Sequence, residues 1–285
     1  MIDFGRRVSR WPLRSARLQR VPGPDAFPAD AHPVADGHDT RRLTHGGRRP
    51  RSVLLLHGYT HSPAQLDALA ARFFERGYNV LAPRAPGHGL VEPGAHATVT
   101  AAGLVAYAAA ALDEAAALGE ETGVVGVSAG AVLATWLAAY RPDAVRRLLV
   151  LAPLYGPHAG QVPAAVRVPM QVLYGLRALP DRRNARGYSY HAVGQYLRIA
   201  ANLPAVFPAA GVRSVAAVLA PGDTTVDARL AFDVPARLAR AAGATLRLDT
   251  LPDDLGLGHD IISTHRLGAH ADALNERYVE LYEAH

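Results

Sequence analysis

The chain has 285 residues, 49% of them hydrophobic, so it can bury a large core as one domain with an insertion or as two small domains. It contains no cysteine, which excludes disulfide bonds, thiolate metal ligands and a cysteine nucleophile. The formal charge of +5 is that of the arginine-rich residues 1–20 alone, so the rest is neutral and lacks the basic stripe of a nucleic-acid-binding surface.

The sequence contains no uninterrupted run of the about 18 to 20 apolar residues that a membrane span needs. The basic start also lacks the apolar segment of a secretory signal. We therefore expect a cytoplasmic protein without integral membrane association, from a GC-rich bacterial genome, and the sequence leaves its oligomeric state open. A frayed tail is the favoured interpretation of the arginine arm, and weak attachment to acidic lipid or to a partner is the alternative.

Residues 1–50 form this arm and a lead-in, within which Asp39 to Thr44 alternates like an edge strand. From Ser52 onward, short apolar runs alternate with helical patterns, which predicts an α/β protein with a mostly parallel, twisted sheet flanked by helices. The predicted strands are Val53 to Leu56, Asn79 to Ala82, Gly123 to Val127, Leu148 to Leu151, Val215 to Leu219 and Thr245 to Leu248. The predicted helices lie near Pro63 to Arg76, Thr98 to Leu118, Ala129 to Tyr140, Val226 to Ala241 and Arg266 to Glu283, the first with Ser62 as its N-cap.

The alternation breaks between Gly156 and Gly211, where aromatic, proline and arginine residues mix with a few helical stretches. We expect residues 51–155 and 211–285 to form the core and residues 156–210 to form a small cap insertion. The cap should cover the C-terminal edge of the sheet, because ligands of open α/β sheets bind there.

The pentapeptide Gly126-Val127-Ser128-Ala129-Gly130 lies where a buried strand ends and an alanine-rich helix begins. A serine hydroxyl is a poor nucleophile unless a sharp turn exposes it beside a base, and small flanking residues tolerate such a turn. Ser128 is therefore the candidate nucleophile. His259, in a glycine-flanked loop after the last predicted strand, is the candidate base.

The base needs a carboxylate to fix its tautomer, and two follow the strand that ends at Leu219. Asp223 is the preferred partner because it is the first carboxylate beyond the strand. Asp227 is the alternative, and we expect it to cap or begin the next helix.

The turn after Leu56 can supply an amide for the oxyanion of a tetrahedral intermediate. We expect the N–H of Tyr59 to act with the N–H of Ala129, while Gly58 allows the turn and His57 supports the loop. The predicted substrate-contacting residues are Gly58, His88, Tyr155, Tyr188 and Tyr190, and ordinary cap packing is the other interpretation of the aromatic ones.

These motifs together resemble the α/β-hydrolase superfamily, in particular small bacterial carboxylesterases and monoacylglycerol-lipase-like members. The resemblance covers about Ser52 to the C-terminus and rests on HGYTHSPAQLDALAARFFERGYNVLAPRAPGHG (His57 to Gly89), GVSAG, GDTTVD (Gly222 to Asp227) and GHD (Gly258 to Asp260). It implies the α/β-hydrolase fold and a triad in the order Ser128, Asp223, His259. The chain departs from many lipase-like relatives at Pro83, where they have an acidic residue.

A cofactor-free and metal-free serine hydrolase that cleaves small-molecule carboxylic esters with an apolar acyl group is the function expected from these residues. Thioester hydrolysis, peptide hydrolysis and acyl transfer use the same constellation and stay open. A non-catalytic protein of this fold that binds a ligand under the cap is the alternative from a different class.

Overall fold

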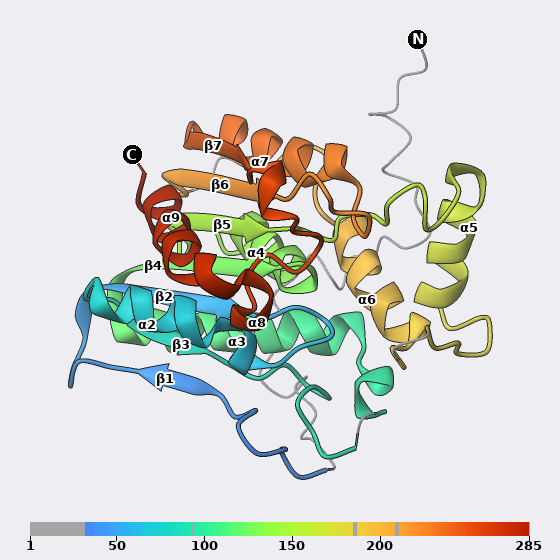
Figure 1. The fold of residues 1–285 in the computed structure, drawn as a ribbon, viewed down its shortest axis with the longest axis horizontal. Coiled ribbons are helices and arrows are strands. Elements are labelled where there is room, and N and C mark those ends of the chain that lie inside the picture. The colour runs from blue at the N-terminus through green and yellow to red at the C-terminus, as the bar shows by residue number, and fades with distance from the viewer. Residues whose placement is uncertain (1–31, 93, 185–186, 209–210, 285) are drawn as a thin grey trace.

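The computed structural model describes residues 32–92, 94–184, 187–208 and 211–284. Its centre is a 7-stranded sheet in the order β1-β3-β2-β4-β5-β6-β7, in which only β1 is antiparallel to its neighbour (Figure 1). The strands are β1 (Arg41–Leu43), β2 (Arg49–Leu56), β3 (Asn79–Ala82), β4 (Gly119–Val127), β5 (Arg147–Leu151), β6 (Ser214–Leu219) and β7 (Thr245–Thr250). The predicted α/β class with a mostly parallel sheet is confirmed.

The helices cover both faces of this sheet. They are α2 (Asp67–Glu75), α3 (Ala101–Leu118), α4 (Ala129–Tyr140), α5 (Ala164–Gly175), α6 (Tyr190–Ala201), α7 (Ala228–Ala242), α8 (Thr264–Leu267) and α9 (Ala271–Glu283). α2 and α9 pack together on one face, α3 and α4 pack together on the other, and α7 packs on β6 and β7 (Figure 1).

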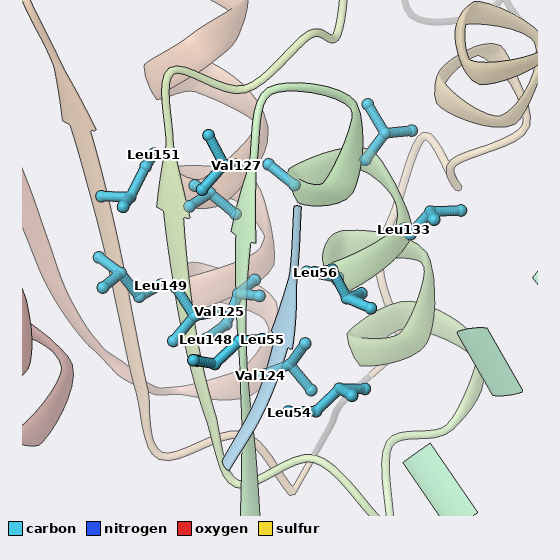
Figure 2. Packing of buried hydrophobic residues seen from close by; sticks show 14 of the residues in the cluster. Leu54, Leu55, Leu56, Val124, Val125, Val127, Leu133, Leu148, Leu149 and Leu151 are labelled. Carbon is cyan, nitrogen blue, oxygen red and sulfur yellow. The ribbon is translucent and has the colours of Figure 1, made fainter. Parts of the chain in front are cut away.

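Three central strands form the middle of the core. Figure 2 shows their aliphatic side chains packed beside α4, and all of them are buried: Leu54, Leu55 and Leu56 of β2, Val124, Val125 and Val127 of β4, and Leu148, Leu149 and Leu151 of β5. Because helices cover both faces, these strands are apolar at successive positions rather than at alternate ones. This rigid centre fixes the C-terminal ends of the strands.

α3 is long and apolar enough to cross a membrane by length and composition alone. In the fold, 61% of this helix is buried, and it packs against β2 and α4. It serves as a core helix of the described structure.

The cap segment, residues 156–210, contains α5 and α6. Both helices lie beyond the C-terminal ends of the strands (Figure 1). α6 packs on α3 and α4, and α5 packs on α6. The lead-in contributes β1, whose Arg41 to Leu43 pair with β3, as the alternation from Asp39 to Thr44 predicted. The arginine arm lies outside the described residues.

Several predicted helix boundaries were wrong for local reasons. Ser62 precedes a short 3-10 helix at Pro63–Leu66, but its hydroxyl bonds to His38 Nδ1 at 2.7 Å instead of capping the helix. α3 begins three residues later than predicted because Thr100, not Thr98, is its N-cap, with its hydroxyl accepting from Gly103 N–H. The last helix is interrupted by Gly268, whose φ of 54° separates α8 from α9.

Candidate active site

Ser128 occupies the turn between the end of β4 and the start of α4. Its backbone has φ 52° and ψ −110°, a strained conformation for a residue with a side chain. The turn is held firmly, since Ser128 N–H donates to Leu151 O at 2.8 Å and Ser128 O accepts from the N–H groups of Ala131 and Leu154. This is the geometry of a nucleophile elbow, with the side chain at the C-terminal end of the sheet.

Two glycines make this turn possible because backbone passes too close for any side chain. A Cβ on Gly126 would lie 2.5 Å from Cα of Ala131, and a Cβ on Gly130 would lie 2.2 Å from the carbonyl oxygen of Leu56. Both obstacles are backbone atoms, which cannot move aside as a flexible side chain would. The small residues around Ser128 are therefore required by the packing of α4 on the ends of β2 and β4.

His259 lies within hydrogen-bond distance of both Ser128 and Asp223. Its Nε2 is 2.8 Å from Ser128 Oγ, and its Nδ1 is 2.8 Å from Asp223 Oδ2. Because an ionised carboxylate can only accept, the Nδ1–H of His259 donates to Asp223, which leaves Nε2 to accept from the Ser128 hydroxyl. Three residues from loops after β4, β6 and β7 thus form one continuous chain of hydrogen bonds.

The two carboxylates after β6 have different surroundings. Asp223 has a fully buried side chain, and besides His259 it accepts two backbone N–H groups of its own loop, at 2.7 and 3.2 Å. Asp227 is the N-cap of α7, accepting from Leu230 N–H at 3.1 Å, and it also pairs with Arg167 of α5 at 2.9 Å. Asp223 therefore faces the histidine, while Asp227 caps a helix and binds the cap segment.

Two backbone N–H groups near the elbow were predicted as oxyanion donors, that of Ala129 in the turn itself and that of Tyr59 in the loop after β2. Ala129 follows the serine directly, and the close approach of Gly130 to Leu56 O brings the loop after β2 beside the start of α4. Within the described part of the chain, neither of these two N–H groups donates a hydrogen bond. Both N–H groups can therefore bind a further acceptor, and their role toward an oxyanion stays a prediction.

Three of the predicted substrate-contacting residues take part in the internal packing. The N–H of Gly58 donates to Gln65 Oε1 at 2.9 Å, and the ring of His88 is buried. Tyr155 is also buried, and its hydroxyl lies 2.6 Å from Thr135 Oγ1 on α4. Their contact with substrate stays a prediction.

The other two predicted contact residues come from the cap segment. Tyr188 is half-buried, and its hydroxyl donates to Thr60 O at 3.3 Å, next to Tyr59. Tyr190, the first residue of α6, is 37% exposed and packs edge-on against Tyr174. Tyr188 thus touches the loop that carries Tyr59, whereas Tyr190 contacts its own cap segment.

Sequence reasoning missed the residues that surround the Tyr59 side chain: Ser189, His96 and Tyr196. A serine directly before a helical pattern is an N-cap signal, and this could have identified Ser189 as the start of α6. No local signal could have linked it to Tyr59, from which it is separated by 130 positions. Among the described residues, no group of three or more histidine or acidic side chains is arranged to hold a metal ion.

The sequence profile of the family described as serine aminopeptidase, S33 matches residues 48–202, more than half of the chain. The chain belongs to this S33 family of α/β-hydrolases. No curated protein matches it significantly in sequence.

Solved structures with the same fold include enzymes named for ester cleavage. A chain from the work on LipS and LipT, two metagenome-derived lipolytic enzymes, has a TM-score of 0.68 at 21% identity, over 88% of this chain and 100% of that one. Est1E from Butyrivibrio proteoclasticus with bound ferulic acid has a TM-score of 0.60 at 21% identity, over 88% and 98%. A soluble variant of the Saccharomyces cerevisiae monoglyceride lipase has a TM-score of 0.58 at 14% identity, over 89% and 91%. At these identities the similarity shows a shared fold.

Two further histidines of this S33-family hydrolase are buried: His57, in the loop that carries Tyr59, and His88, in the loop after β3. Burial, reinforced by the neighbouring His88, lowers the pKa of His57 to about 3, and its ring accepts from Ala85 N–H and donates to Gly58 O. Burial likewise lowers the pKa of His88 to about 4, although a hydrogen bond to Pro86 O opposes this shift. Both rings are therefore neutral at pH 7.

These two histidines predict a loss of stability in acid. Between about pH 6.5 and pH 4, these two histidines are protonated in the unfolded chain but neutral in the folded chain. The free energy of unfolding therefore falls as the pH falls, by about 1.4 kcal/mol per pH unit for each histidine. Their contribution is complete above pH 6.5. We expect urea unfolding of His88→Gln to show a pH slope shallower by about one proton than that of wild type in this window. Equal slopes in the two proteins would mean that His88 is protonated normally in the fold.

Proposed function

We propose that this protein is a serine esterase that hydrolyses small-molecule carboxylic esters through Ser128, His259 and Asp223. The observation that carries the proposal is the chain of two 2.8 Å hydrogen bonds that joins these residues, starting from a serine held at φ 52°. Such a strained residue at a strand end, with an aligned base, is the arrangement that nucleophilic catalysis needs.

In the first half of the reaction, His259 Nε2 takes the hydroxyl proton of Ser128 as Oγ attacks the ester carbonyl carbon. The carbonyl oxygen becomes an oxyanion, which accepts hydrogen bonds from the N–H groups of Tyr59 and Ala129. Asp223 stabilises the imidazolium through its bond to Nδ1–H and keeps its own negative charge. The imidazolium then returns its proton to the departing alkoxide, the bond to the alcohol breaks, and an acyl-Ser128 ester is left.

In the second half, His259 takes a proton from water, whose oxygen attacks the acyl carbon. The second oxyanion uses the same two N–H groups. When it collapses, the bond to Ser128 Oγ breaks, Oγ recovers a proton from His259, and the carboxylic acid leaves. No cofactor is needed for either half, because nucleophile, base and oxyanion donors all come from the chain.

The family match and the esterase neighbours support an ester substrate in general, and the ferulic acid bound to Est1E supports a small-molecule one. Tyr188 and Tyr190 of the cap segment, and Tyr155 directly before it, support an apolar acyl group, because they are aromatic and Tyr188 contacts the loop that carries Tyr59. The name of the family makes aminopeptidase activity the second candidate. Amino-acid p-nitroanilides test that candidate with the same preparation of enzyme.

The cellular setting is proposed from the sequence alone. We propose a cytoplasmic bacterial enzyme without a nucleic-acid partner and without integral membrane association. We also propose that the core consists of residues 51–155 and 211–285, and that the cap insertion, residues 156–210, covers its site. Fractionation of the native host tests this placement.

Replacement of Ser128 by alanine tests the nucleophile. We expect hydrolysis of p-nitrophenyl esters, from acetate to palmitate, to fall by roughly 10⁴- to 10⁶-fold in kcat for Ser128→Ala, with an unchanged fold by circular dichroism. The chain length at which wild type is fastest will report the depth of the acyl site. Activity of Ser128→Ala equal to that of wild type would refute the proposal.

The two carboxylates after β6 provide a matched pair of variants. We expect Asp223→Asn to lower kcat by about 10⁴-fold, because a neutral partner no longer holds the tautomer of His259 or stabilises its positive charge. Asp227→Asn should change kcat by only about threefold or less, since its losses are the Arg167 ion pair and part of the α7 cap, together worth about 1 kcal/mol of stability. A larger kcat loss in the Asp227 variant would reverse the assignment.

A further inference from the structure

Tyr59 joins two parts of the molecule that lie far apart in sequence. Its backbone belongs to the loop after β2, which lies beside the start of α4, while its side chain is buried under the cap segment, where the hydroxyl donates to Ser189 O at 2.7 Å. One residue therefore carries both the proposed oxyanion donor and a direct hydrogen bond to the cap segment.

The acceptor of this hydrogen bond is held rigidly. Ser189 is fully buried and is the N-cap of α6, where its hydroxyl accepts from Ala192 N–H at 3.2 Å. Its own N–H donates to Nε2 of the buried His96, in the 3-10 helix Ala95–Thr98, at 3.2 Å. The carbonyl that Tyr59 contacts thus moves only if the start of α6 moves.

Aromatic rings enclose the Tyr59 side chain from three segments. His88 and His96, from the loops after β3, meet its ring edge-on at centroid distances of 5.8 and 5.6 Å. Tyr188 and Tyr196, from the cap segment, pack at an angle to it, each at 5.8 Å. Burial also raises the pKa of the Tyr59 hydroxyl well above its usual value, so it stays protonated as a donor at every working pH.

The backbone of this loop is also fixed on both sides of Tyr59. On one side Gly58 N–H donates to Gln65 Oε1 at 2.9 Å, and on the other Tyr188 donates to Thr60 O at 3.3 Å. A side chain anchored between these points limits the rotation of the peptide that carries the Tyr59 N–H. The carbonyl of the same peptide, Gly58 O, accepts from His57 Nδ1 at 2.9 Å and from His61 N–H at 3.1 Å, so the direction of the Tyr59 N–H depends on these bonds as well as on the position of α6.

We propose that the Tyr59 side chain is a positioning group, which aligns its own backbone N–H with the oxyanion by holding to Ser189 at the start of α6. This inference rests on the proposed function, because an oxyanion forms only if Ser128 is the nucleophile. The cap segment then controls the rate of the chemical step as well as access to the site, since a displaced α6 would leave the oxyanion with a misdirected donor.

The same helix provides a matched control. At the other end of α6, Tyr140 of α4 donates its hydroxyl to Asn202 O, the C-cap residue, at 2.6 Å. Tyr59→Phe and Tyr140→Phe each remove one tyrosine hydroxyl that donates to a backbone carbonyl at an end of α6. Only Tyr59 belongs to the loop at the site. Both variants should therefore lose stability of the cap segment, whereas only Tyr59→Phe should lose the alignment of the Tyr59 N–H with the oxyanion.

Kinetics with p-nitrophenyl butyrate and inhibition by phenylboronic acid separate these effects. The tetrahedral boronate formed on Ser128 places an oxygen where the oxyanion forms. We expect Tyr59→Phe to lower kcat by about 10- to 100-fold with KM changed less than about threefold, a fraction of the 10²- to 10³-fold loss caused by complete removal of an oxyanion donor. The Ki of the boronate should rise by about the factor by which kcat/KM falls. Tyr140→Phe should keep kcat and Ki within about twofold at a similar loss of thermal stability.

Equal kcat and Ki in Tyr59→Phe, Tyr140→Phe and active wild type would overturn this inference and leave the proposed function intact. A wild type that neither hydrolyses esters nor binds the boronate would overturn both. If Tyr59→Phe does not fold, Tyr188→Phe replaces it, because this half-buried residue holds the same loop through Thr60. We expect a kcat loss of about two- to tenfold at unchanged KM for that variant, and an unchanged kcat would overturn the inference.

Discussion

The contact between the start of α4 and the end of β2 is the constraint on which the site depends. Gly130 lies so close to Leu56 O that no side chain fits between them, and this contact sets both the turn at Ser128 and the position of the loop that follows β2. The strained φ of Ser128 is maintained because its backbone makes three hydrogen bonds and lies among buried residues at the ends of β4 and β5. The proposed nucleophile and the loop of the proposed oxyanion donor thus both depend on this packing contact.

Asp223 and His259 lie on the loops after β6 and β7. These loops lie at the same edge of the sheet as Ser128, because the C-terminal ends of parallel strands lie together. The cap segment is fastened on two sides of Ser128. At the loop after β6, Arg167 of α5 pairs with Asp227, four residues beyond Asp223. At the loop after β2, the hydroxyl of Tyr59 donates to Ser189 O at the start of α6. Two polar contacts thus join the cap segment to loops on either side of Ser128.

Local patterns were sufficient for much of this architecture. Short apolar runs that alternate with helical patterns predicted all six parallel strands, and the glycines around Ser128 predicted the turn between β4 and α4. Side-chain partners were harder to predict, because they depend on segments that meet only in the folded chain. Ser62 bonds to His38 instead of capping its helix, and the hydroxyl of Tyr155 lies against α4. The Tyr59 to Ser189 contact follows no sequence period and required the fold.

Covalent labelling with a fluorophosphonate, followed by mass spectrometry of the intact protein and of its peptides, tests the central claim most directly. The reagent transfers its phosphonyl group to an activated serine and releases fluoride. The account predicts one adduct per chain, located on the peptide that contains Ser128, and strongly slowed labelling when His259 is replaced by alanine. An adduct on a different residue that abolishes ester hydrolysis, or ester hydrolysis that persists in a protein fully labelled at Ser128, would contradict it.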